Sequence, residues 1–174
     1  QRIWEHLKTL GFDFHTPEPA TYEEIRAVHS DDHIDRLKKG NFFDPDTPAI
    51  PRIFDIAVVS AGGAIQAAEL SGFSICRPPG HHATRDRIMG FCYLNNIAIA
   101  VMKQLKKKKR IAILDIDCHH GNGTEEIFAY HDRVLYCSLH QSPLYPGTGL
   151  SSHDNVFNFP LPPGTGGEEY LATL

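Results

Sequence analysis

The most distinctive part of the hydropathy pattern is a short apolar run at residues 111–116, which lies between a lysine cluster and two glycines. A run of branched residues without polar alternation is typical of a parallel strand that is covered on both faces. Similar short runs predict further strands at residues 73–76, 133–140 and 156–159.

Helices are predicted before and between these strands. Thr21 and Glu24 form a capping box, and Ser30 is placed to cap a second helix. The predicted helices cover residues 1–10, 21–29, 30–38, 53–70, 94–107, 124–130 and the chain from 168 onward. Because helices alternate with strands, the pattern predicts a single α/β domain with a mainly parallel sheet.

The composition changes this picture little. Hydrophobic residues make up 41% and charged residues 22% of the 174 positions, as in ordinary globular domains. The net charge of −4 argues against nucleic-acid binding as a main task. We expect no membrane-spanning segment and no signal peptide, and therefore no membrane partner.

The four cysteines are dispersed along the chain, without a Cys-x-x-Cys pair. Three of them lie in or beside apolar runs, which predicts buried free thiols in a reducing compartment, so we expect a cytoplasmic protein. The run Lys106–Lys109 offers a nuclear address or a nucleic-acid patch as an alternative. Cations at the carboxyl end of a helix, favoured by its dipole, are the preferred interpretation.

Candidate chemistry lies at the end of the central strand. Residues two apart in an extended chain point the same way, so Asp115, Asp117 and His119 share one face. Asp117 and His119 can converge on one ion, whereas Asp115 lies closer to the sheet. Carboxylate and imidazole ligands suit a catalytic zinc or a similar divalent metal. The alternative is a strand end whose acids only cap the following loop and helix.

Two other strand exits also carry polar residues. His81 and His82 follow the first predicted strand, and Ser138 and His140 precede a loop with Tyr145. Ligand sites of α/β sheets lie outside the carboxyl ends of the strands, so the three exits predict one site. A metal there would polarise a carbonyl, and a neighbouring histidine could move a proton to a leaving amine.

Four motifs occur in order along this part of the chain, reading RPPGHHA, GFCYLNN, DIDCHHGNGT and SLH…YPGTG. In sequence and spacing they resemble the histone deacetylase superfamily, from Asp46 onward. Asn122 makes the chain similar to the class II branch and its prokaryotic relatives, and acetylpolyamine amidohydrolases share much of the pattern. The resemblance implies part of a three-layer α/β/α fold with a mainly parallel sheet, as in arginases and deacetylases.

The same resemblance implies catalytic roles. Asp117 and His119 match two of the three ligands of one catalytic zinc. His82 matches the general base and acid, paired with Asn122. His81 matches the neighbouring histidine that assists electrostatically and is held by Asp115.

Substrate and ion sites are implied in the same way. Gly90, Phe91 and Tyr145 match the walls of a narrow tunnel for an acetylated lysine side chain, and Asp46 matches an acidic residue of the rim. Acetylated polyamines and other small acylated amines fit the same tunnel. Structural potassium is implied at two places: at Asp115, Asp117, His119, Ser138 and Leu139, and at the carbonyls of Phe128, His131 and Val134.

The chain also departs from the family pattern. The third zinc ligand, an Asp, and the transition-state Tyr or His have no counterpart before Leu174, and the first strand of the family is missing. We therefore expect a partial domain that is inactive by itself. A catalytically inactive binding or scaffold module is the alternative. An arginase-like binuclear site would instead need Asp-x-His-x-Asp at the strand end.

Overall fold

The structure is a computed structural model that describes residues 2–174. Its helices are α1 (Arg2–Thr9), α2 (Tyr22–Arg26), α3 (Asp31–Lys39), α4 (Ile53–Leu70), α5 (Asn96–Gln104), α6 (Asn122–Phe128) and α7 (Gly167–Thr173). Its strands are β1 (Ile111–Asp115), β2 (Val134–Gln141) and β3 (Val156–Leu161). The capping box at Thr21 and the cap at Ser30 are confirmed.

The three strands form one sheet in the order β1-β2-β3, and both pairings are parallel. The register places Asp115 opposite Ser138, and Ser138 opposite Asn158. All three strands therefore end on the same side of the molecule, as crossover connections require. The prediction of an α/β fold with a mainly parallel sheet is confirmed.

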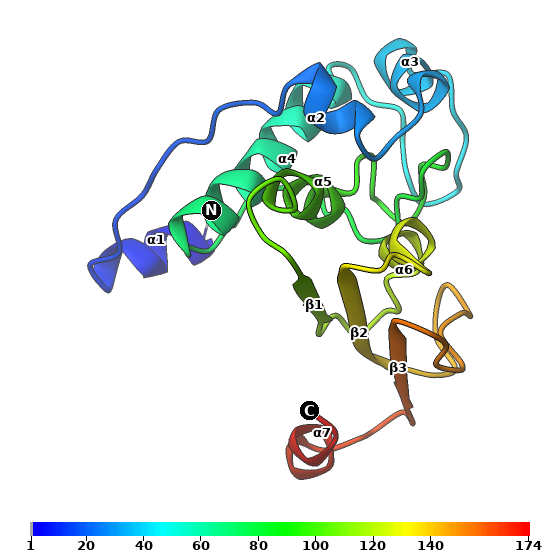
Figure 1. Cartoon of the computed structure of the whole chain (residues 1–174). Helices are drawn as coiled ribbons and strands as arrows, with labels where there is room; N and C mark the ends of the chain where they lie inside the picture. The colour runs from blue at the N-terminus through cyan, green and yellow to red at the C-terminus, as the bar shows by residue number, and fades with distance from the viewer. Residues whose placement is uncertain (1) are drawn as a thin grey trace.

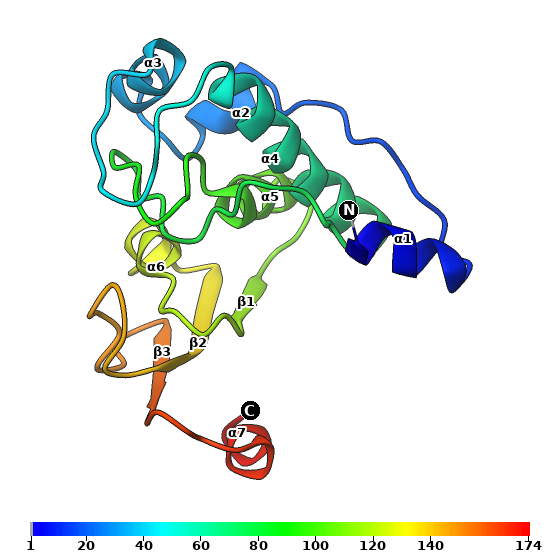
Figure 2. The same cartoon turned by 180° about the vertical axis from the view of Figure 1, so that it is seen from behind.

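Helices α5 and α6 lie on one side of this sheet, and α4 packs on α5 (Figures 1 and 2). Ile113 and Tyr136 join the core on that side. The side chains between them point the other way, and Leu114, Leu135 and Phe157 are 53%, 41% and 42% exposed. The prediction that β1 is covered on both faces is therefore wrong for the part of the chain described.

Residues 73–76 do not form the predicted strand. Phe73 is 87% exposed. Cys76 instead lies against α4, where a Cβ on Gly63 would meet its sulfur at 2.8 Å. An apolar run of this length forms a strand only if a neighbouring strand pairs with it, and this segment packs on a helix.

The expectation that no segment is long and apolar enough to span a membrane is wrong for α4. Its 18 residues have a mean hydropathy of 1.4, which meets that test by length and composition, and 39% of them are buried in the protein. The small residues explain this composition. A Cβ on Gly62 would meet the Glu18 carbonyl oxygen at 1.8 Å, so α4 packs closely on the chain before α2.

Two histidines of the amino-terminal part, His29 after α2 and His33 in α3, are fully buried. The rings of His29 and His33 stack with centroids 4.2 Å apart. His29 Nε2 accepts a hydrogen bond from the Asn95 amide at 2.9 Å, so its Nδ1 carries the proton and faces the Arg85 carbonyl at 3.3 Å. Burial and the neighbouring His33 lower the pKa of His29 to about 3.

The four cysteines are free thiols, as predicted. Only one of the four, Cys92, is fully buried, whereas Cys118 is exposed between Asp117 and His119. The expectation of buried thiols for the cysteines in apolar runs is therefore correct for Cys92, whereas Cys76 and Cys137 are only partly buried.

Candidate active site

The loop with the tandem histidines is held by main-chain hydrogen bonds to the start of α6. The carbonyl oxygen of His81 accepts from the amides of Gly123 and Thr124 at 3.0 and 3.1 Å. A Cβ on Gly123 would meet the Ala83 carbonyl oxygen at 2.3 Å, so only glycine allows this approach. The loop therefore lies directly beside the segment that follows β1.

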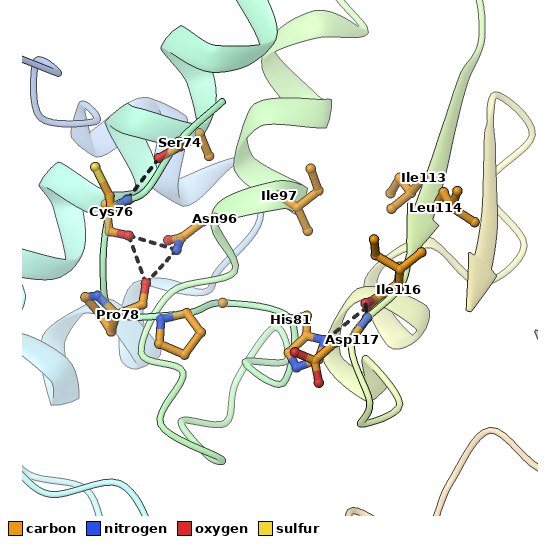
Figure 3. A pocket seen from close by; sticks show the side chains of 15 residues that line it. Ser74, Cys76, Pro78, His81, Asn96, Ile97, Ile113, Leu114, Ile116 and Asp117 are labelled. Carbon is orange, nitrogen blue, oxygen red and sulfur yellow. Dashed lines mark hydrogen bonds and ion pairs between the residues drawn. The ribbon is translucent and has the colours of Figure 1, made fainter. Parts of the chain in front are cut away.

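His81 forms an ion pair with the last residue of β1. Its Nδ1 lies 3.0 Å from Asp115 Oδ2, and both side chains are largely buried. Burial opposes the charge of His81, but the hydrogen bond and charge of Asp115 outweigh it and raise the pKa of the imidazole. Figure 3 shows His81 beside Asp117 at one end of a pocket that extends to Asn96.

His82 has an uncharged partner instead. Its Nδ1 lies 2.8 Å from Asn122 Oδ1, the side-chain oxygen of the first residue of α6. Burial and then the charge of His81 lower the pKa of His82 to about 4. The ring centroids of His81 and His82 are 4.1 Å apart. The pKa values of these adjacent imidazoles are therefore shifted in opposite directions by their different surroundings.

Asp117 and His119 converge at the end of the same strand. Asp117 Oδ1 accepts hydrogen bonds from the His119 amide at 2.8 Å and from its Nδ1 at 3.0 Å. Their side chains are 50% and 43% exposed. Among residues 2–174, no group of three or more His, Cys, Asp or Glu side chains is placed to hold a metal ion. The pair offers a carboxylate and an imidazole, which fit a divalent metal as two of its ligands.

The residues expected to line a tunnel lie around His82. A Cβ on Gly90, whose φ is +57°, would meet His82 Cδ2 at 2.6 Å and the Tyr145 hydroxyl at 3.0 Å. The Tyr145 ring is 5.1 Å from that of His82 and 6.3 Å from that of His119. Phe91 follows Gly90 and is 58% exposed. Gly90, Phe91 and Tyr145 therefore form an open rim beside His82 and His119.

Asp46 lies in the loop that reaches this rim. Its amide donates to Asp44 Oδ2 at 3.2 Å. Burial raises the pKa of Tyr145, and the charges of Asp44 and Asp46 raise it further. Both carboxylates are therefore close enough to Tyr145 to influence its hydroxyl. Thr47 joins the loop to the rim, since its hydroxyl accepts from the Phe91 amide at 2.8 Å.

The residues expected at potassium sites are grouped in two places. Ser138 and Leu139 are buried, and the Ser138 hydroxyl pairs with His140 Nδ1 at 2.9 Å. At the other place, the carbonyls of Phe128 and Val134 both accept from the Asn155 side chain, at 2.8 and 2.7 Å. The His131 carbonyl accepts from the Val134 amide. The Asn155 amide therefore accounts for the convergence of two of these carbonyls.

Sequence reasoning missed one residue that contacts the site. The Tyr136 hydroxyl donates to Asp115 Oδ2 at 3.1 Å, and its distance to the Gly121 carbonyl is 3.2 Å. Burial raises its pKa, with a further contribution from Asp115. The signal was present, because a tyrosine that alternates toward the core in β2 needs a hydrogen-bond partner.

Known proteins resemble the chain over most of its length. A protein described as a probable deacetylase from Archaeoglobus fulgidus is 46% identical over 177 residues, which cover 91% of this chain and 49% of that protein. Acetylpolyamine amidohydrolase 1 of Pseudomonas aeruginosa is 40% identical over 76% of this chain and 43% of its own length. The chain therefore spans about half the length of these curated relatives.

A solved structure agrees with these sequence matches. The crystal structure of an acetylpolyamine aminohydrolase from Burkholderia pseudomallei superimposes with a TM-score of 0.89 at 28% identity, over 98% of this chain and 65% of the other. The family model of the histone deacetylase domain matches residues 1–174. This chain therefore belongs to the histone deacetylase domain family.

Proposed function

We propose that this chain contributes the proton-transfer residues and two metal ligands of an amidohydrolase that cleaves acetyl amides. Membership of the deacetylase family supports the hydrolysis of acetyl amides in general. One observation supports the finer assignment. The adjacent histidines His81 and His82 have partners of different charge, Asp115 and Asn122.

His82 is the proposed general base and acid. The Asn122 oxygen can only accept, so His82 Nδ1 carries the proton and Nε2 keeps its lone pair for the reaction. With a pKa of about 4, the imidazole is neutral near pH 7 and ready to take a proton. After taking it, His82 can return the proton to the leaving amine.

His81 is proposed to act electrostatically. Asp115 orients its ring and favours its charged form, because it raises the pKa of that imidazole. A positive charge at this position stabilises negative charge that develops on the substrate oxygen. The same charge disfavours a proton on His82, which keeps the base unprotonated before the reaction.

Asp117 and His119 are the proposed ligands of one zinc ion. When bound, zinc would polarise the acetyl carbonyl and lower the pKa of a coordinated water. Asp115 lies behind them, since its Oδ1 accepts from the Asp117 amide at 3.2 Å. Potassium is proposed only as a structural ion near Asp115 and Ser138, and not as part of the reaction.

The proposed substrates are an acetylated lysine side chain of a protein or an acetylated polyamine or small amine. Gly90, Phe91 and Tyr145 would contact the acetylated arm, and Asp46 would contact the substrate at the rim. Among the relatives, one name refers to a deacetylase and another to acetylpolyamine hydrolysis, in agreement with both substrate types.

The test uses the full-length protein with an acetyl-lysine peptide and an N-acetylated diamine, and it measures released acetate. We expect release from at least one substrate and a loss of about 10²–10⁴ in rate for His82→Ala. Tight binding of metal and of an acetylated amine without acetate release would contradict the proposal and favour the binding-module alternative.

A further inference from the structure

A second group of polar side chains, centred on Glu125, contacts the loop of residues 142–155. The carboxylate of Glu125 in α6 is 20% exposed and contacts three donors. It accepts from Asn158 Nδ2 at 2.7 Å, from His120 Nε2 at 2.9 Å and from His153 Nε2 at 3.5 Å. Burial opposes the charge, and the hydrogen bonds outweigh it and lower the pKa of Glu125 to about 2.

These three donors belong to three different parts of the chain. His120 follows the proposed ligand His119, His153 lies in the loop itself, and Asn158 lies on β3. Glu125 therefore joins the metal-ligand segment, the loop and the sheet through one side chain. The mechanism proposed above uses none of these four residues.

The loop is held closely by this group. His120 Nδ1 lies 2.8 Å from the Thr148 hydroxyl, and Asn158 Nδ2 donates to the Ser151 carbonyl at 3.1 Å. A Cβ on Gly149, whose φ is +75°, would meet His120 Cδ2 at 2.5 Å. The backbone of the loop thus rests directly on the His120 ring, which is itself only 2% exposed.

The same loop carries Tyr145 to the rim of the site. Thr148 is three residues from Tyr145, and the turn between them is closed by the Gly147 amide on the Leu144 carbonyl at 2.8 Å. A displacement of Thr148 would therefore be passed on to Tyr145, whose ring lies 5.1 Å from that of His82.

We propose that Glu125 is a positioning residue that fixes loop 142–155 to the metal-ligand segment, and thereby sets the place of Tyr145 and the affinity for the acetylated amine. The part that concerns affinity rests on the function proposed above. A carboxylate is needed because it offers only acceptors, whereas a Gln amide would turn donors toward donors.

The test compares Glu125→Gln with Glu126→Gln in the full-length protein. Glu126 is the next residue of α6 and is exposed. It accepts a hydrogen bond from the Arg85 amide at 3.2 Å, and a Gln oxygen can accept the same bond. The two variants therefore make the same change in charge. Hydrogen exchange of residues 144–152 is measured first, and KM and kcat for an acetyl-lysine peptide and an N-acetylated diamine are measured second.

For Glu125→Gln we expect exchange in residues 144–152 to become at least about tenfold faster, KM to rise about tenfold, and kcat to stay within about twofold. Glu126→Gln should match the parent protein. Equal exchange in all three proteins, or equal acceleration in both variants, would overturn the proposal. A loss confined to kcat would overturn the assigned role in affinity.

Thr148→Val separates positioning from general loss of stability. It removes only the hydroxyl that contacts His120 and leaves all three donors on Glu125. We expect faster exchange in residues 144–152 and unchanged exchange in β3. Unchanged exchange at the loop would contradict the proposal. If the parent protein released no acetate, the proposed function would fail, and the exchange data would still decide the positioning role.

Discussion

His82 Nδ1 and Asn122 Oδ1 are joined by a hydrogen bond of 2.8 Å, and this bond gives the proposed base a neutral partner. His81, one residue earlier, has a carboxylate partner at 3.0 Å. Burial lowers the pKa of both imidazoles, but the hydrogen bond and charge of Asp115 outweigh it at His81, whereas burial and the charge of His81 keep the pKa of His82 low.

Asn122→Asp should therefore move the pH dependence of the reaction. A carboxylate beside His82 would raise the pKa of this imidazole above its present value of about 4. Because the base must be neutral, the acidic limb of the kcat/KM profile should shift to higher pH. The measurement is a pH–rate profile of the full-length protein. An acidic limb that stayed in place would show that His82 is not the titrating base.

Substitution of the tandem histidines should have unequal effects. His82→Ala removes the proton shuttle and should reduce the rate by about 10²–10⁴. His81→Ala removes a charge next to the reaction and should cost less. Single-turnover acetate release from both variants, with circular dichroism to check folding, measures the difference. A larger loss of rate for His81→Ala than for His82→Ala would mean that His81, and not His82, is the proton shuttle.

Metal content should depend on the residues at the end of β1. Asp117→Ala and His119→Ala each remove a proposed zinc ligand, so we expect each variant to lose most of its bound zinc. Elemental analysis of the purified full-length protein measures this directly. Asp132→Ala, which changes an exposed carboxylate beyond α6, is the control. Zinc that survives both substitutions at one ion per chain would contradict the ligand assignment.

The buried histidine pair should make the fold sensitive to acid. His29 is neutral in the fold because its pKa is about 3, whereas an unfolded chain takes up the proton below its ordinary value of 6.5. The contribution of His29 to the free energy of unfolding should thus be fully present above pH 6.5. It should decrease as the pH falls from 6.5 toward 3. One such group contributes at most about 1.4 kcal/mol for each pH unit.

Urea unfolding at several pH values tests this expectation, with His29→Gln for comparison. Gln can still accept from the Asn95 amide but does not titrate, so the variant should be less stable at pH 7 and lose less stability on acidification. Identical slopes in the two proteins would show that another group is responsible for the acid sensitivity.

The sequence was most informative at the ends of the strands. Hydropathy and the alternation of helices with strands were sufficient to predict a mainly parallel sheet, because these signals are local. The alternation of side chains also predicted that Asp117 and His119 would converge, but β1 ends at Asp115, and it is the bend after the strand that brings these side chains within 3.0 Å. The tandem histidines were candidates from the pattern alone, but the pairing of His82 with Asn122 required the family resemblance, since no local signal places these residues together.

Other features depend on contacts between distant segments. The stacked pair His29 and His33 becomes buried only when the Arg85 and Tyr93 carbonyls reach these rings. Residues 73–76 had the composition of a strand, but no strand pairs with them in the part of the chain that the structure describes. Tertiary packing decides both cases, and a single sequence does not contain that information.

The main-chain bonds between the His81 carbonyl and the amides of Gly123 and Thr124 have a consequence for how this site tolerates change. The proposed base and the proposed ligands lie on separate segments, yet the two segments are connected through the backbone. Thermal displacement of α6 would carry both segments in the same direction, so the distance between base and ligands is preserved. This connection also survives replacement of most side chains, and a mutational scan should find Gly123 far less replaceable than Thr124.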